Sequence, residues 1–238
     1  MIKKRTIQDI IQWLKTPTDF RNKSIWKEEE NNTIYEYQKL ATELYMDLKN
    51  DGYYIFTDAF LDDINEIEKL DAQDRNIVKF TKFTTSLSNK LSKTKEFDAE
   101  EQWFILLNLY LSLCESIKSL HLKYIRDVYD NLSDKSGYRI GNFVTLYPFV
   151  ETMRRYKNGK YVKLFESINV DLRNSIAHLD YYFEDGNNNI YYKATHIEGT
   201  DFILNYRKIA ILFAILYIDR SKVFANEYEQ KAKDHGLI

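Results

Sequence analysis

The chain has 238 residues, a formal net charge of −2 at pH 7, 44% hydrophobic residues and 29% charged residues. This composition excludes a disordered chain and a polycation that would bind nucleic acid over its whole surface. Any nucleic-acid partner must therefore be held by a local basic patch. The single cysteine, Cys114, excludes an intramolecular disulfide and a cysteine-cluster zinc site.

The sequence lacks the features of a secreted or membrane-spanning protein. Its basic N-terminus is followed by neither the apolar core nor the small-residue cleavage site of a signal peptide. The longest apolar run, Ile209 to Ile218, is shorter than the roughly 20 residues that cross a bilayer. We therefore expect a soluble protein of the cytoplasm with no membrane contact.

Long helices are expected, because seven glycines and two prolines are few for this length. A first helix is predicted from Ile7 to Leu14, and Pro17 ends that segment. A second helix begins at the capping-box pair Thr33 and Glu36 and ends at Asp51-Gly52. Its inward face is expected to contain Ile34, Tyr37, Leu40, Ala41, Leu44 and Leu48.

A polar segment divides the chain after these elements. An acidic amphipathic stretch runs from Asp58 to about Asp71, and a helix follows from Ile77 to Leu91. We expect this helix to direct inward Phe80, Phe83, Leu87 and Leu91. The polar residues Ser92–Glu96 then form the best candidate for a junction. The division gives an N-terminal helical region of unknown role, 1–95, and a helical domain, 96–238.

The second region is predicted to begin with a long buried helix. This helix runs from Asp98 towards Leu132, with or without a break. Its segment Trp103–Cys114 is apolar nearly all round, which is typical of a central helix. Gly137 and Gly141 bracket a loop, and a helix over roughly Asn142–Tyr156 follows, in which Pro148 either introduces a kink or marks the start.

Three further elements complete the predicted bundle. A helix covers Lys160–His178. Tyr181–Glu184 and Ile190–Lys193 then flank Asp185-Gly186 and three asparagines, the pattern of a small β-hairpin. An apolar helix over Phe202–Val223 closes the core.

A helical wheel of Lys160–His178 separates an apolar stripe from a polar flank. The stripe lies within about 40° of Leu172 at 100° per residue and contains Phe165, Ile168, Leu172, Ile176 and Leu179. Asp171, Asn174 and His178 cluster on another flank, and Arg173 lies about 140° from His178. Either Arg173 bends towards His178, or a second subunit helps to complete the site.

The segment Arg173-Asn174-Ser175-Ile176-Ala177-His178 resembles the defining motif of HEPN-family ribonucleases, in which Arg and a polar residue precede His on one helix. The resemblance covers roughly 98–226. It implies an all-α, HEPN-like helical bundle with a small β-hairpin after the motif helix and an N-terminal helical extension. It also implies a metal-independent endoribonuclease with no cofactor that acts as a homodimer on RNA. Such a protein would be a toxin or antiphage-defence effector, restrained by an antitoxin or another regulatory protein.

The resemblance also assigns roles to the three catalytic residues. His178 would accept or donate a proton near neutral pH. Arg173 would stabilise charge on the phosphorane oxygens, and Asn174 would orient the histidine or the phosphate. Attack by the 2′-hydroxyl leaves 2′,3′-cyclic phosphate and 5′-hydroxyl ends, so DNA would not be cleaved.

A basic segment rich in tyrosine lies immediately upstream of the motif. Cations can hold phosphates and aromatic rings can stack on unpaired bases, so we expect RNA to bind here. The RNA-binding residues are predicted to be Arg154, Arg155, Tyr156, Lys157 and Lys160. A solvated loop with charged helix ends is the alternative. The lysines between Lys79 and Lys95 form a second basic region.

Two carboxylates, Asp171 and Asp180, are candidates to support His178, although a solvated polar face also explains them. Two other functions remain open. A HEPN domain without catalytic activity could serve as a nucleotide-binding or protein-interaction module. Alternatively, the N-terminal third could be the working part, as a partner-binding or sensor domain that restrains the nuclease.

Overall fold

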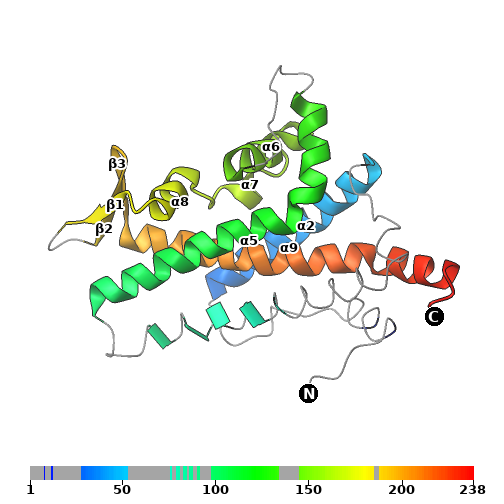
Figure 1. The fold of residues 1–238 in the computed structure, drawn as a ribbon, viewed down its shortest axis with the longest axis horizontal. Helices are drawn as coiled ribbons and strands as arrows, with labels where there is room; N and C mark the ends of the chain where they lie inside the picture. Colours follow the sequence, from blue (N-terminus) through cyan, green and yellow to red (C-terminus); the bar gives the residue numbers. More distant parts are fainter. Residues whose placement is uncertain are drawn as a thin grey trace. The chain divides into compact units, whose positions relative to one another are not determined.

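The computed structural model describes residues 28–52, 98–133, 145–184 and 188–238, together with residues 8, 12, 76, 79–80, 83–84, 86–87 and 90–91. These residues are mostly helical and include one three-stranded antiparallel sheet, which agrees with the predicted fold class at this coarse level (Figure 1). The chain forms two compact units, one of residues 1–86 with 214–238 and one of residues 87–213.

The first unit contains helix α2, Glu28–Asn50. The helix begins five residues before the predicted capping box, because the acidic run Glu28–Glu30 favours a helix N-terminus. It ends at Asn50, directly before the predicted stop at Asp51-Gly52. The φ of Gly52 is +74°, which suits glycine, and its N–H donates to the Lys49 carbonyl at 3.0 Å. Five residues of the predicted inward face are buried, namely Ile34, Tyr37, Ala41, Leu44 and Leu48. Leu40 is half-buried, and Tyr45, which was not predicted, is buried as well.

Several predicted elements lie outside the described residues. These are the acidic stretch 58–71, the loop around Gly137 and Gly141, and the helix Ile7–Leu14 apart from two helical positions. The predicted helix Ile77–Leu91 is described at single helical positions only. Among them Leu91 is buried, whereas Phe83 is 58% exposed, so the prediction that Phe83 points inward was wrong.

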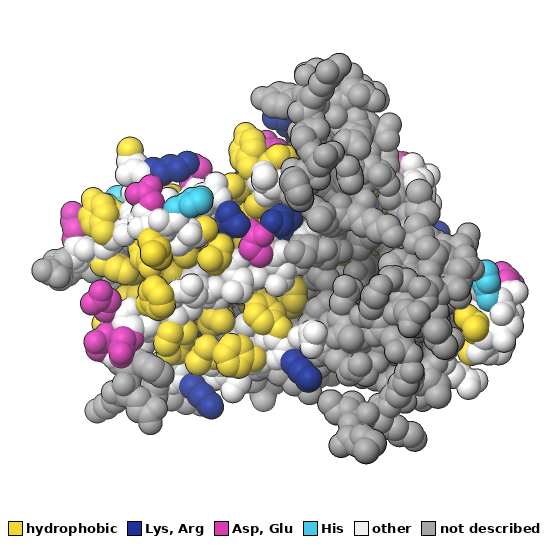
Figure 2. Space-filling view, in the orientation of Figure 1, with side chains coloured by type: hydrophobic (Ala, Val, Ile, Leu, Met, Phe, Trp, Pro, Cys, Tyr) yellow, Lys and Arg dark blue, Asp and Glu magenta, His cyan; other side chains and the backbone are white. Residues whose placement is uncertain are grey.

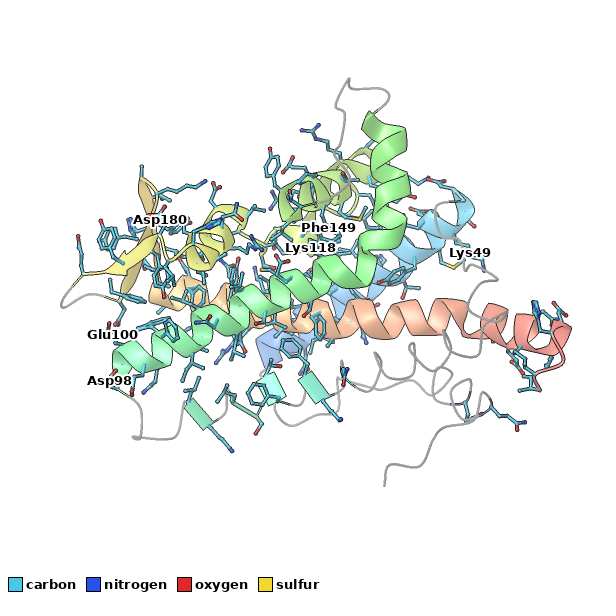
Figure 3. All side chains as sticks on the ribbon, in the orientation of Figure 1. Lys49, Asp98, Glu100, Lys118, Phe149 and Asp180 are labelled. Atoms are coloured by element: carbon cyan, nitrogen blue, oxygen red, sulfur yellow. The ribbon has the colours of Figure 1, made fainter. Side chains whose placement is uncertain are left out.

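Helix α5, Ala99–Ser133, is the central element of the second unit and confirms the predicted long helix. A capping box fixes its start, since the Asp98 N–H donates to the Glu101 carboxylate at 3.0 Å and the Glu101 N–H returns a bond of 2.9 Å to Asp98. Asp98 is labelled at this end in Figure 3. Further along, α5 packs against helices α6 and α8, and the rings of Trp103 and Tyr110 contact Phe202.

Helix α6, Leu146–Gly159, carries Pro148 in its first turn, where the missing N–H breaks no helical bond. Regular helix ends before Tyr156, whose ψ is 136°, and Lys157 and Asn158 have left-handed φ values of +51° and +57°. The short helix α7, Val162–Phe165, follows. The basic segment is therefore a sharp reversal between two helices.

The predicted hairpin is confirmed, and a third strand extends it. Strand β1, Tyr181–Phe183, pairs antiparallel with β2, Asn189–Tyr192, which pairs with β3, Thr195–Glu198. Helix α9, Gly199–Asp234, begins directly after β3 and is longer than predicted at both ends. At Gly199 a Cβ would lie 2.7 Å from the Asn188 carbonyl oxygen and 2.8 Å from the Trp103 ring, so only glycine fits this connection. Within the described ranges, no helix has the length and apolar character needed to cross a membrane.

Candidate active site

The motif lies on its own short helix, α8, Val170–Ala177. The prediction of one helix over Lys160–His178 was wrong, because α7 ends at Phe165 and α8 starts afresh at its N-cap, Asn169. The Asn169 side-chain oxygen accepts a 3.0 Å hydrogen bond from the Leu172 N–H. Ile168 remains buried although it lies between the helices, which explains why the apolar pattern looked continuous.

Asn169 also ties the start of α8 to two other elements. Its backbone N–H donates to the Tyr110 hydroxyl of α5 at 2.8 Å, and its side-chain nitrogen donates to the Tyr192 hydroxyl of β2 at 2.7 Å. Burial raises the pKa of Tyr110 well above its ordinary value, so its hydroxyl stays neutral. Burial likewise raises the pKa of the neighbouring Cys114 thiol to about 12. The motif helix is therefore held at its N-cap by an uncharged network of largely buried side chains.

The other end of α8 turns sharply at His178. The Leu179 N–H donates to the Ile176 carbonyl at 3.2 Å and the Asp180 N–H donates to the Ser175 carbonyl at 2.8 Å, which is the Schellman arrangement. Leu179 takes the left-handed position with φ +56° and is 73% exposed. The prediction that Leu179 belongs to the core stripe was wrong, because α8 ends at Ala177, two residues before it.

Arg173 extends from α8 to α5. One terminal nitrogen of its guanidinium forms an ion pair with the Glu115 carboxylate, and the other donates to the Asn174 side-chain oxygen at 2.8 Å. Its Nε is buried and has no hydrogen-bond partner in the part of the chain that the structure describes. Glu115 also pairs with Lys118, which is labelled above α5 in Figure 3. Sequence reasoning missed Glu115, since it lies 58 residues away from Arg173 and nothing in its local pattern distinguishes it.

Asn174 connects the other two motif residues. Its side chain accepts the bond from Arg173, and its carbonyl oxygen accepts a 3.0 Å bond from the His178 N–H. The His178 side chain is exposed, and among the described residues its imidazole has no hydrogen-bond or ion-pair partner. Arg173 is thus fixed against α5, while His178 presents a free ring to solvent at the end of the helix.

The two carboxylates that were candidates to support His178 form no hydrogen bond or ion pair with its imidazole among the described residues. Asp171 is 61% exposed and pairs with Lys193 in the β2–β3 turn at 2.5 Å. Asp180 is exposed, and the structure gives its backbone N–H a role in closing the end of α8. Both residues therefore have a place in the local structure without contacting His178.

The five candidate RNA-binding residues differ in accessibility. The Arg154 guanidinium donates to the carbonyl oxygens of Phe165 at 3.2 Å and Ile168 at 3.5 Å, so it holds the chain between α7 and α8. The Tyr156 ring is buried and stacks on Tyr161 with ring centroids 5.9 Å apart. In this arrangement Arg154 is bonded to backbone carbonyls and the Tyr156 ring is packed on Tyr161.

The other three basic candidates are placed at the surface of the reversal. Arg155 is 69% exposed and lies 3.6 Å from Glu151. Lys157 and Lys160 lie over the rings of Tyr156 and Tyr161, with ammonium-to-centroid distances of 5.6 Å and 5.2 Å. The two tyrosine rings therefore position these ammonium groups at the surface through cation–π contacts.

Hydrophobic side chains also reach the surface of the second unit. Figure 2 shows them gathered over the part of this face that α5 and the sheet occupy. The most exposed ones in this unit are Phe104, Tyr147, Val162, Leu179, Tyr182 and Leu204. Within the described part of the chain, no group of three or more His, Cys, Asp or Glu side chains could hold a metal ion.

Comparison with protein-family models, with curated proteins and with solved structures finds no match.

Proposed function

We propose that this chain is a metal-independent endoribonuclease of the HEPN type, with Arg173, Asn174 and His178 as its catalytic residues. The observation that carries the proposal is the contrast within one short helix. Arg173 is anchored through Glu115 and Asn174, whereas the imidazole of His178 is exposed and unengaged among the described residues. A fixed cation and an accessible proton carrier are the two groups that cleavage of RNA by its own 2′-hydroxyl requires.

The proposed reaction is an internal transesterification. The 2′-hydroxyl oxygen attacks the adjacent phosphorus and loses its proton, while the bond from phosphorus to the 5′-oxygen breaks and that oxygen gains a proton. The products are a 2′,3′-cyclic phosphate and a 5′-hydroxyl. His178 accepts or returns the proton, because imidazole can do both near neutral pH.

Arg173 is proposed to stabilise the phosphorane. A guanidinium has five N–H donors, and the described bonds to Glu115 and Asn174 use two of them. The terminal nitrogens therefore retain donors for phosphate oxygens. Because the side chain is already held and only 20% exposed, little conformational freedom is lost when it binds an anion.

The proposal includes a homodimer in which two α8 helices share one cleft. Arg173 is directed to α5 within its own chain, so a second copy is a simple source of a further His178 beside the same phosphate. Two exposed hydrophobic side chains support such a contact, Leu179 at the end of α8 and Phe104 on α5. A contact between identical faces about a two-fold axis is the commonest oligomer geometry.

RNA is proposed to approach over the α6–α7 reversal. Arg155, Lys157 and Lys160 present their charges there, and Arg154 and Tyr156 hold the backbone that carries them. We further propose a role as a toxin or antiphage-defence effector in the cytoplasm, with an antitoxin or another regulatory protein as partner, and residues 1–95 as the region that restrains the nuclease.

A second candidate is a HEPN domain without catalytic activity. The ion pair between Arg173 and Glu115 favours it, because a tie between α8 and α5 accounts for the arginine without any reaction. On this account the chain would act as a nucleotide-binding or protein-interaction module.

Nuclease assays in EDTA distinguish the two functions. We expect the purified wild type to cleave single-stranded RNA, and His178→Ala to lose cleavage while keeping its thermal midpoint. His235→Ala, which changes an exposed histidine near the C-terminus, is the matched control and should cleave normally. RNA left intact by the wild type, with or without added divalent metal, would favour the non-catalytic module.

A further inference from the structure

The outer face of the three-stranded sheet carries a row of stacked rings. Tyr182 of β1 lies opposite Tyr191 of β2, which lies opposite His196 of β3. The two tyrosine rings are nearly parallel, with centroids 5.0 Å apart at 10°, and the Tyr191 and His196 rings are 5.3 Å apart at 32°. Each of the three strands thus contributes one ring to the stack.

These rings do not form the core side of the sheet. Successive side chains of a strand point to opposite faces, so the neighbours of these rings face the core. On that face Ile190 and Tyr192 are buried and Phe183 packs on Trp103. Tyr182 is 56% exposed, and β1 and β3 are the edge strands of the sheet that the structure describes. The outer ring faces at the two ends of the stack therefore have no neighbouring strand against them.

We propose that Tyr182, Tyr191 and His196 form a base-stacking subsite for single-stranded RNA, which extends the ribonuclease function proposed above and rests on it. Flat aromatic rings bind unpaired bases of any sequence, because every base offers a π-face. A base that stacks on the open face of Tyr182 would continue the existing ring stack.

The subsite is fixed close to the motif. Tyr182 follows His178 by four residues, and four residues of extended chain span at most about 14 Å. Figure 1 shows the sheet beside α8, and Asp180 is labelled at their junction in Figure 3. The hydrogen bond between Asn169 and Tyr192 and the ion pair between Asp171 and Lys193 fix the position of α8 relative to the sheet.

The charged side chains at the two ends of the sheet favour one direction for a bound RNA strand. Lys193, 51% exposed, is in the turn at the end of the sheet nearest α8. Glu184 and Glu198 lie at the opposite end. Because Lys193 is already paired with Asp171, the contrast between the two ends rests on the acidic far end, which repels a phosphate. We therefore expect the RNA backbone to lie towards the α8 end and His178 while one base occupies the rings. The acidic far end also disfavours a long duplex across the sheet.

Binding of a 2′-O-methyl oligoribonucleotide tests this proposal separately from cleavage, since such RNA lacks the attacking hydroxyl. We expect Tyr182→Ala and Tyr191→Ala to weaken binding at least about fivefold in fluorescence anisotropy. Tyr182→Phe should bind as the wild type does, because phenylalanine keeps the ring. Tyr35→Ala, which removes a 63% exposed tyrosine from α2, is the matched control and should also bind normally.

Cross-linking on the wild-type protein makes the test independent of variant folding. A 4-thiouridine oligoribonucleotide should cross-link to the peptide that contains Tyr182 or Tyr191. Cross-links confined to Lys157–Lys163, or alanine variants that bind RNA normally, would overturn the subsite and leave the proposed nuclease intact if His178→Ala still abolishes cleavage. Loss of self-association with unchanged RNA affinity would also overturn it, because the rings would then serve a protein contact.

Discussion

Arg173 owes its position to a residue on another helix. Its guanidinium is shared between Glu115 and Asn174, and both side chains of the ion pair are partly buried, with 20% and 33% of their surface exposed. A pair of this kind is screened less than one on the surface, and removing one partner leaves a charge without compensation. Glu115 is thus expected to act as a positioning residue for Arg173, the proposed catalytic arginine.

Replacing Glu115 tests this role. Glu115→Gln keeps a hydrogen-bond acceptor but removes the charge, and we expect kcat to fall about tenfold because the arginine is held less firmly. Glu115→Ala should lose more, with the free energy of unfolding lower by about 1–2 kcal/mol. The control is Glu166→Gln, which alters an exposed pair with Lys208. Unchanged kcat in both Glu115 variants would show that the ion pair has a structural role only.

Helix α8 shows how far sequence patterns reach at the scale of an element. The motif, the hairpin and the long central helix were all readable from local spacing. The break before Val170 was missed, although Asn169 followed by an acidic residue is a recognisable helix start, because the buried Ile168 kept the apolar period intact. Strand β3 was missed because Thr195–Glu198 is short and weakly alternating. The Arg173–Glu115 pair depends on packing between helices, which no local pattern contains.

The N-cap of α8 is expected to be the main determinant of motif geometry. Asn169→Ala removes the bonds to Leu172 and Tyr192 and should lower the free energy of unfolding by about 2 kcal/mol. Asn169→Asp retains the capping oxygen and should recover most of that loss. Chemical denaturation of the two variants measures the difference. Equal stability of Asn169→Ala and wild type would mean that α8 does not depend on its cap.

The basic reversal between α6 and α7 separates binding from folding. Arg155→Glu with Lys157→Glu should weaken RNA binding strongly at low salt and much less at high salt, because phosphate contacts act through counterion release. The thermal midpoint should change little, since Arg155 is exposed. Arg154→Glu, in contrast, should lower the midpoint, because it breaks the bonds to Phe165 and Ile168. Full RNA affinity at low salt in the double variant would move the docking site elsewhere, with the lysines 79–95 as the next candidates.

At the scale of the whole molecule, the proposed cleft needs two chains. Mixing His178→Ala with wild type at constant total protein tests this directly. If two copies of His178 act on one phosphate, activity falls more steeply than the fraction of wild type, because mixed dimers are also impaired. Leu179→Asp should reduce both dimer formation and activity, since it places a charge on the proposed contact. A linear decline, with a monomer in sedimentation at working concentration, would exclude the shared cleft.

The central claim is that Arg173, Asn174 and His178 cleave RNA through its own 2′-hydroxyl. End-group analysis of RNA cut in EDTA tests that claim most directly. Wild type and His178→Ala are compared on two substrates, an oligoribonucleotide and the same oligonucleotide with a single 2′-deoxy residue at the cut. We predict 2′,3′-cyclic phosphate and 5′-hydroxyl ends from the wild type alone, and no cut at the deoxy position. Products with 5′-phosphate ends, cleavage at the deoxy residue, or full activity of His178→Ala would contradict the mechanism.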